Sequence, residues 1–120
     1  MKVLTFEEID SLKERGYFNS SIDTQYNNSE FECLQKLSVY NINPTPYLYL
    51  LRDMNNQTIL NLKKFICLKW NNVASSLDDI TLNFKENTIT QICIFFLNTD
   101  KDKNHRVYFF IEMIHQYFFP

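Results

Sequence analysis

The chain has 120 residues, of which 45% are hydrophobic and 16% aromatic, so it can bury a core of its own and is not a disordered segment. Its formal net charge is −2 and it has no stripe of lysine and arginine, which argues against nucleic-acid binding. The longest unbroken apolar run, from Ile92 to Leu97, is far shorter than the roughly 20 residues that a membrane helix needs. We therefore expect one globular domain over residues 1–120 that does not bind a membrane.

The N-terminus and the cysteines both indicate the cytoplasm. The first residues, Met-Lys-Val-Leu-Thr-Phe-Glu-Glu, become acidic at once and lack the apolar core of a signal peptide. The cysteines are odd in number and widely spaced at Cys33, Cys67 and Cys93, so they form no CxxC metal or redox pair. Buried free thiols are typical of a reducing compartment. We expect a cytoplasmic protein without a metal or another cofactor.

A helix is predicted from about residue 6 to residue 15. Thr5 and Glu8 have the spacing of a capping box, in which each side chain accepts a hydrogen bond from the backbone N–H of the other residue. Gly16 stands where a left-handed residue would end the helix. The apolar residues that recur at helical spacing are Phe6, Ile9 and Leu12. A loop over residues 17–28 is expected to follow.

The negative charge of the chain is concentrated at its beginning. Residues 1–32 hold three basic and seven acidic groups, a net charge of −4, whereas the remaining residues hold nine basic and seven acidic groups, a net charge of +2. The outer face of the first predicted helix carries the carboxylates of Glu7, Glu8, Asp10 and Glu14. Such a face is suited to a basic protein partner, because complementary charge speeds and orients association.

A second helix is predicted over residues 30–40, followed by a break. The apolar residues of this stretch lie on one helical stripe: Phe31, Leu34, Leu37 and Tyr40. Pro44 and Pro46 come soon afterwards, and the residue before a proline is disfavoured in the helical conformation. The break separates a helical front from the rest of the chain.

The middle of the chain is ambiguous between strand and helix. Residues 47–52 read as a strand, but Thr45 as a cap and Pro46 at the first helical position would equally begin a short helix. Residues 58–70 partly fit a helix, although their apolar positions nearly encircle it. Strands are slightly favoured, because the polar residues 53–57 would make a good hairpin turn between them.

The last third predicts a long β-hairpin. Residues 88–97 and 106–119 are rich in β-branched and aromatic residues, and they flank the entirely polar residues 98–105. Residues 80–84 alternate between apolar and polar side chains, as a half-buried strand does. The predicted fold class is therefore α+β, with two N-terminal helices packed on an antiparallel sheet of three to five strands that ends in this hairpin.

Tyr108 and Phe110 would lie on the second face of the predicted sheet. Two helices can cover only one face, so the second is either covered by the middle segment or by the 17–28 loop, or left as an exposed aromatic patch. An exposed patch would bind a protein partner or a second copy of the chain.

The polar turn does not predict a metal site. Residues 100–104 resemble the start of a calcium loop, but His105 stands where the required glycine would be and Ile111 where the bidentate glutamate would be. Asp78 and Asp79 are adjacent acids in a polar stretch, and we expect them to be solvated.

Catalysis is not predicted either. Cys93 and His115 would lie on neighbouring strands, where a Cys–His nucleophile pair is geometrically possible. No third orienting group is evident, and an apolar strand would raise the pKa of the thiol rather than activate it.

These patterns favour a small protein that acts by binding another protein. The leading hypothesis is an inhibitor of the bacterial immunity or antitoxin type, which occludes the active site of a toxic enzyme such as a nuclease. The carboxylates of the first helix would imitate phosphates. The alternatives are a structural homodimer or adaptor joined through the sheet, an inhibitor of a host defence enzyme encoded by a mobile element, and a small enzyme that uses Cys93 or His115.

Overall fold

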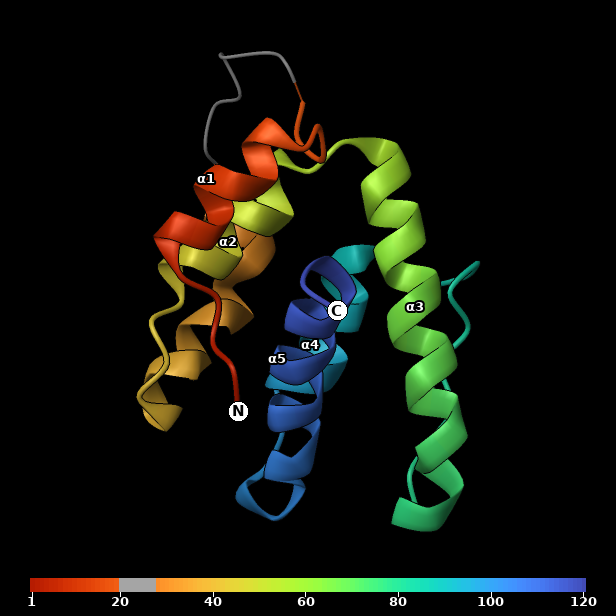
Figure 1. The fold of residues 1–120 in the computed structure, drawn as a ribbon. Coiled ribbons are helices and arrows are strands. Elements are labelled where there is room, and N and C mark those ends of the chain that lie inside the picture. The colour runs from red at the N-terminus through yellow and green to blue at the C-terminus, as the bar shows by residue number, and fades with distance from the viewer. Residues whose placement is uncertain (20–27) are drawn as a thin grey trace.

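The computed structural model describes residues 1–19 and 28–120, and that part of the chain contains helices but no strand (Figure 1). The α-helices are α1 (Phe6–Glu14), α2 (Thr45–Asp53), α3 (Asn56–Ala74), α4 (Ile89–Leu97) and α5 (Asn104–Phe118), and the 3₁₀ helices are η1 (Asn28–Tyr40), η2 (Ser75–Leu77) and η3 (Lys101–Lys103). An antiparallel bridge joins Phe18 to Met54. The predicted α+β fold is therefore wrong, and no sheet is present in the described residues for a second copy to join.

Helices α4 and α5 form the centre of the molecule. The two pack against each other, α4 also packs against η1, and α5 packs against α3. Helices α1 and α2 contact each other on the side of η1, so α1 and α3 lie at opposite sides of the molecule (Figure 1). No described helix combines the length and the apolar character needed to cross a membrane.

Residues 88–97, predicted as a strand, form α4 because a capping box begins a helix there. The hydroxyl oxygen of Thr88 accepts a hydrogen bond from the backbone N–H of Gln91 at 3.1 Å, and the Gln91 side chain accepts one from the backbone N–H of Thr88 at 2.9 Å. The β-branched and aromatic residues are abundant because α4 is central and packs on several sides. Its buried residues are Ile92, Cys93, Phe96 and Leu97.

Residues 106–119 were also predicted as a strand, and they form most of α5. The buried residues recur at intervals of three and four, which is the helical period: Val107, Phe110, Ile111, Ile114, His115 and Phe118. The enrichment in β-branched and aromatic residues therefore reflects burial. The polar connection between the two segments is shorter than predicted, because η3 lies within it and α5 begins at Asn104.

The middle segments are helices as well, so the slightly favoured strand interpretation is wrong. Residues 47–52 lie in α2, which has Pro46 in its first turn. Residues 58–70 lie in α3, where Asn55 caps the helix by accepting hydrogen bonds from the backbone N–H of Thr58 at 2.9 Å and from its hydroxyl at 2.7 Å. The predicted turn over residues 53–57 thus contains the junction between two helices, and only Met54 and Asn55 lie outside them.

Both N-terminal predictions correspond to helices, although the second is interrupted by non-helical backbone at Phe31. Helix α1 has the complete capping box between Thr5 and Glu8, and Gly16 follows it with a φ of 82°, a conformation that only glycine adopts readily. The second predicted helix is η1, whose hydrogen bonding is of the tighter 3₁₀ type. The predicted loop over residues 17–28 lies mostly outside the described residues.

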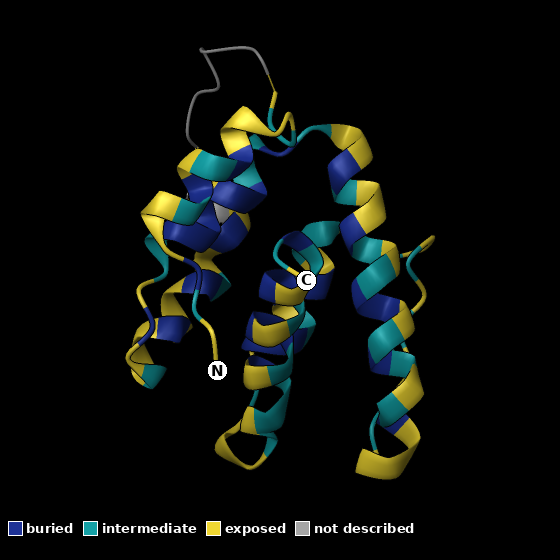
Figure 2. Ribbon diagram, viewed as in Figure 1, coloured by how far each residue is buried: buried dark blue, intermediate teal, exposed yellow. Residues whose placement is uncertain are grey.

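A single apolar core joins the helices, as the dark residues in Figure 2 show. Tyr47 of α2 is fully buried in it, and its hydroxyl oxygen accepts a hydrogen bond from the backbone N–H of Leu4 at 2.8 Å. Burial raises the pKa of Tyr47 to about 12. This contact fixes the segment that leads into α1 and so positions that helix on the bundle.

Candidate functional site

Three of the four predicted carboxylates form an exposed row on α1, which we call the acidic stripe. Glu7, Asp10 and Glu14 are separated by three and four residues, so they lie along one face of the helix. All three are exposed, and the side chain of Asp10 is 77% accessible to solvent. Lys13 lies 4.0 Å from Asp10, a contact between exposed groups that leaves the stripe acidic.

Two exposed aromatic rings lie together beside the first turn of α1, where the acidic stripe begins, and we call them the aromatic pair. Phe6 of α1 and Tyr49 of α2 meet edge to face, with their ring centroids 6.2 Å apart. Phe6 is 47% exposed and Tyr49 is 38% exposed. The guanidinium of Arg52 lies over the Tyr49 ring at 4.8 Å from its centroid. Exposed aromatic residues beside charged ones are typical of protein–protein interfaces.

Glu8, the fourth predicted carboxylate, is directed inward. Its Oε2 lies 2.6 Å from His115 Nε2, and its Oε1 accepts the backbone N–H of Thr5 at 2.9 Å. Burial acts to raise the pKa of Glu8, but the hydrogen bonds from His115 and Thr5 hold this pKa below its usual value. The Glu8–His115 contact joins α1 to α5, so Glu8 serves the fold and does not belong to the exposed stripe.

The two predicted aromatic site residues of α5 point in different directions. Phe110 is fully buried, and its ring stacks on Phe96 with centroids 5.3 Å apart. Tyr108 is 41% exposed and meets the ring of Tyr40 edge to face at 5.6 Å. Residues two apart share a face of a strand but diverge on a helix. Phe110 is therefore a core residue, and only Tyr108 reaches the surface.

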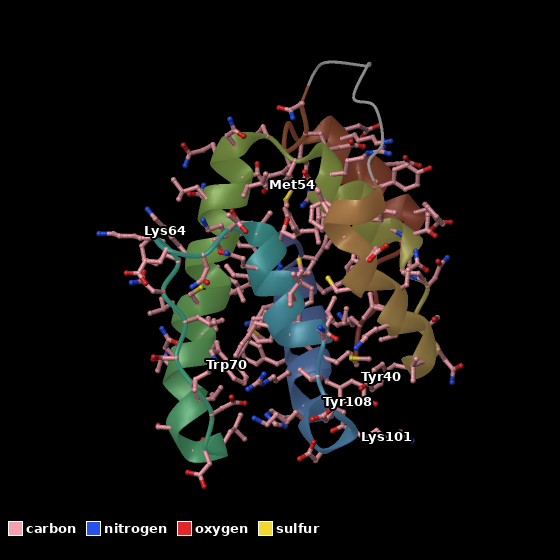
Figure 3. The ribbon with its side chains drawn as sticks, turned by 180° about the vertical axis from the view of Figure 1, so that it is seen from behind. Tyr40, Met54, Lys64, Trp70, Lys101 and Tyr108 are labelled. Carbon is pink, nitrogen blue, oxygen red and sulfur yellow. The ribbon has the colours of Figure 1, made fainter. Side chains whose placement is uncertain are left out.

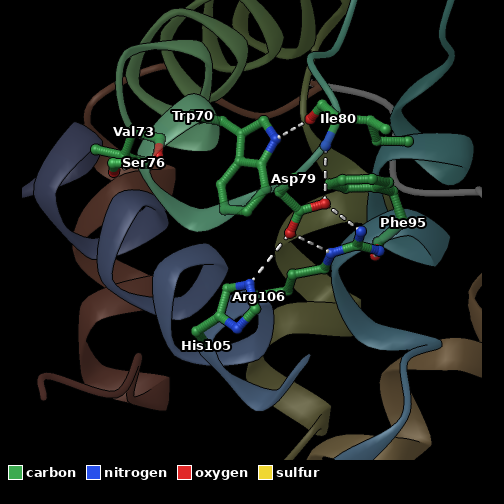
Figure 4. Close-up of polar contacts among 8 residues, drawn as sticks. All are labelled: Trp70, Val73, Ser76, Asp79, Ile80, Phe95, His105 and Arg106. Atoms are coloured by element: carbon green, nitrogen blue, oxygen red, sulfur yellow. Dashed lines mark hydrogen bonds and ion pairs between the residues drawn. The ribbon is translucent and has the colours of Figure 1, made fainter. Parts of the chain in front are cut away.

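Asp79, expected to be solvated, is instead the centre of a buried polar cluster (Figure 4). Its side chain is 1% exposed, and its two oxygens bind the Arg106 guanidinium, one of them by a 3.0 Å hydrogen bond from Nε. His105 Nε2 lies 3.1 Å from the same carboxylate. The hydrogen bonds from Arg106 hold the pKa of Asp79 well below its usual value; burial opposes them and the His105 hydrogen bond adds to them.

Side-chain contacts around the Asp79 cluster hold residues 80–84, the segment that follows η2, against the helices. Trp70 Nε1 donates a 2.8 Å hydrogen bond to the carbonyl of Ile80, and the indole ring stacks on His105 with centroids 6.3 Å apart. Arg106 lies over the Phe95 ring, 4.0 Å from its centroid. Residues 80–84, predicted as a strand, have no strand partner and are held by such side-chain contacts with α3.

An Asp–His pair is also part of many hydrolytic sites, in which the histidine activates a nucleophilic serine or cysteine. Ser76 and Cys93 are not arranged in that way here. The hydroxyl of Ser76 donates to the carbonyl of Val73 at 2.8 Å (Figure 4). Cys93 is fully buried, and burial raises the pKa of its thiol well above the ordinary value, which opposes its use as a nucleophile. Within the described residues, no group of three or more His, Cys, Asp or Glu side chains is placed to hold a metal ion.

A scan against protein-family models and searches of the curated proteins and of the solved structures found no match to the chain. Inference of function therefore depends on the surfaces described above. The acidic stripe was predicted from sequence, whereas the aromatic pair was not, because Tyr49 reaches Phe6 only when residues 45–53 form a helix. The possible helix start at Thr45 and Pro46 was the available signal for that arrangement.

Proposed function

We propose that the protein is a small cytoplasmic inhibitor of the immunity or antitoxin type, which binds a basic protein through the outer face of α1. The observation that carries the proposal is the combination of the acidic stripe with the aromatic pair on one exposed face. Carboxylates attract and orient a basic partner, and exposed aromatic rings supply the anchors that dominate interface energies. The inhibitor would cover the active site of its target.

A nuclease is the class of target that this face fits best. The active site of a nuclease is built to hold consecutive phosphates, so a row of carboxylates can occupy the same positions. A rise of about 1.5 Å per residue places Glu14 roughly 10 Å along the axis of α1 from Glu7. Asp10 lies between them, and the three carboxylates therefore present negative charge over a length comparable with a short run of nucleotides.

Helix α1 is held rigidly enough to present its outer face without reordering. Ile9 and Leu12 anchor its inner face in the core. The Glu8–His115 contact fixes its first turns, and Arg15 at its end donates a 3.1 Å hydrogen bond to the carbonyl of Phe118. A surface that is already ordered loses little conformational entropy on binding, and this favours tight association.

The proposal is tested by capturing the target from the native source with the immobilised protein. The test variant reverses the acidic stripe (Glu7→Lys, Asp10→Lys, Glu14→Lys). The matched control makes the same change in net charge at exposed residues elsewhere (Glu86→Lys, Asp102→Lys, Glu112→Lys). We expect the wild-type protein and the control to capture one basic protein and the stripe variant to lose it.

The captured protein must also be inhibited. An equimolar amount of the wild-type protein should abolish the enzymatic activity of the captured protein, and the stripe variant should not. Capture that survives reversal of the stripe would contradict the proposed surface, and a captured protein whose activity is unaffected would contradict the inhibitory role. An inhibitor of a host defence enzyme would use the same face, and the identity of the captured protein distinguishes that alternative.

A further inference from the structure

A groove runs along the contact between η1 and α4, on a side of the molecule that the proposed inhibitory surface does not include. Two cavities of about 330 and 190 Å³ lie along it, and Lys36 lines both of them. The larger cavity is also lined by Glu30, Glu32, Cys33, Ile94 and Asn98, and the smaller one by Val39, Tyr40, Leu97, Thr99 and Lys101. We call this feature the η1–α4 groove.

The η1–α4 groove has opposite charges at its two ends, and its middle holds apolar side chains beside Lys36, which lines both cavities. Glu30 and Glu32 are exposed at one end, and Lys101 is exposed at the other. Ile94, in the larger cavity, is 44% exposed and Val39, in the smaller one, is 75% exposed, although both are apolar. Exposed apolar side chains bordered by charges are characteristic of a surface that receives another molecule.

The basic end of the groove has polar groups suited to a carboxylate. Lys36 Nζ donates to the side-chain oxygen of Asn98, and this contact leaves further ammonium protons for a ligand. Figure 3 shows Tyr40, Tyr108 and Lys101 gathered at this end. Lys101 is exposed there, so it offers a second ammonium group, besides that of Lys36, to a carboxylate ligand.

We propose that the η1–α4 groove binds a short extended segment of another protein, with a basic side chain beside Glu30 and Glu32, apolar side chains over Ile94 and Val39, and an acidic side chain beside Lys101. The charges of the groove select this order. The cavities, of about 330 and 190 Å³, are small beside ordinary small-molecule pockets of roughly 300–1,000 Å³, and so they suit single side chains. From Glu32 to Val39, the rise of a 3₁₀ helix, about 2 Å per residue, gives a distance of roughly 14 Å. An extended peptide covers that length with about four residues, and one further residue at each end for the charged contacts makes about six.

The test uses a random peptide library displayed on phage and selected against the immobilised wild-type protein. Selected sequences are synthesised with a fluorophore, and their Kd values are measured by fluorescence polarisation. We expect them to share basic, apolar and acidic positions within about six residues. Lys101→Glu should weaken binding at least tenfold, whereas Lys85→Glu, the same change at an exposed lysine outside the groove, should leave it within twofold. A peptide whose acidic residue is replaced by lysine should recover its affinity for the Lys101→Glu variant.

A second variant tests the apolar middle. Val39→Glu alters a side chain that is 75% exposed, so the fold should be kept while peptide binding is lost. The proposal is overturned if the selection yields no shared motif, or if the selected peptides bind both groove variants as well as the wild type. It is also overturned if sedimentation shows a dimer that Val39→Glu dissociates, because the occupant would then be a second copy. Reversal of the acidic stripe should not affect peptide binding, so this proposal and the proposed inhibitory function can fail independently.

Discussion

At the scale of single residues, the acidic side chains divide into those that hold the fold and those that are free for a partner. Asp79 is buried against Arg106, and Glu8 is held by His115. Glu7 and Asp10, by contrast, point to solvent. Sequence position alone does not separate these roles, because the partners of Asp79 and Glu8 are distant in the sequence. Substituting Asp79 or Glu8 should therefore lower the stability of the fold, whereas substituting Glu7 or Asp10 should weaken binding and leave stability unchanged.

Replacing Asp79 by asparagine should strongly destabilise the protein. The substitution leaves Arg106, whose side chain is only 11% exposed, without its counter-charge. Breaking a buried ion pair in this way costs about 3–5 kcal/mol. Urea unfolding at pH 7 measures the change. The control is Asp78→Asn, at an exposed neighbour with a left-handed φ of 52° that asparagine tolerates, and it should change the free energy of unfolding by less than about 0.5 kcal/mol.

The same carboxylate makes stability depend on acid pH. The pKa of Asp79 is lower in the folded protein than in the unfolded chain, so the folded state is stabilised above the unfolded pKa of about 4. This contribution is lost as the pH falls from about 4 toward the folded pKa. The free energy of unfolding should consequently decrease more steeply on acidification for the wild-type protein than for Asp79→Asn. Equal slopes for the two proteins below pH 4 would show that Asp79 does not contribute.

Glu8 and Glu7 provide a matched comparison on one helix. Glu8→Gln weakens the contact with His115 and should cost about 1 kcal/mol, since hydrogen bonds to charged groups contribute more than neutral ones but Glu8 is partly exposed. Glu7→Gln changes an exposed side chain and should leave the free energy of unfolding within about 0.5 kcal/mol. The two variants are compared by thermal unfolding. A loss as large for Glu7→Gln as for Glu8→Gln would contradict the assignment of their roles.

At the scale of secondary structure, capping residues indicated the helices more reliably than the content of β-branched and aromatic residues did. The capping box at Thr5 correctly predicted α1, and the equivalent box formed by Thr88 and Gln91 begins α4. The strand prediction for residues 88–97 followed their β-branched and aromatic content, which is a consequence of central burial. Propensity is a weak guide where nearly every side chain of an element is packed.

The part of the candidate site that lies within one helix could be predicted from the sequence. Helical spacing on α1 was sufficient to place Glu7, Asp10 and Glu14 on one outer face. It could not show that Glu8 turns inward, because its partner His115 lies on another helix. The aromatic pair and the η1–α4 groove arise where separate elements pack together. Such surfaces become visible only when the packing of the helices is known.

Removal of the α4 cap tests the helical assignment of the last third. Thr88→Ala deletes the hydroxyl that accepts the backbone N–H of Gln91, and such a loss costs about 1 kcal/mol. Thr81→Ala, at an exposed position in the preceding loop, should be neutral. The variants are compared by urea unfolding. A strand over residues 88–97 would not depend on a helix cap, so an unchanged free energy of unfolding for Thr88→Ala would contradict the assignment.

At the scale of the whole molecule, charge is distributed unevenly between opposite sides. Helix α1 carries the acidic stripe, whereas α3 carries Lys63, Lys64 and Lys69 and no acidic residue. The two helices lie on opposite sides of the central α4–α5 pair (Figure 1). A molecule with a net charge of only −2 can therefore still orient toward a basic partner, because the local field of α1 exceeds what the net charge implies.

The most direct test of the proposed function is the affinity of the captured target for the stripe variant as a function of salt concentration. The wild-type protein and the control with Glu86, Asp102 and Glu112 reversed should bind alike, with a Kd that rises with ionic strength. Three lost charge contacts of about 1 kcal/mol each predict a Kd at least about 100-fold weaker for the stripe variant, with a reduced dependence on salt. Equal affinities for the stripe variant and the control at every ionic strength would contradict the assignment of binding to α1.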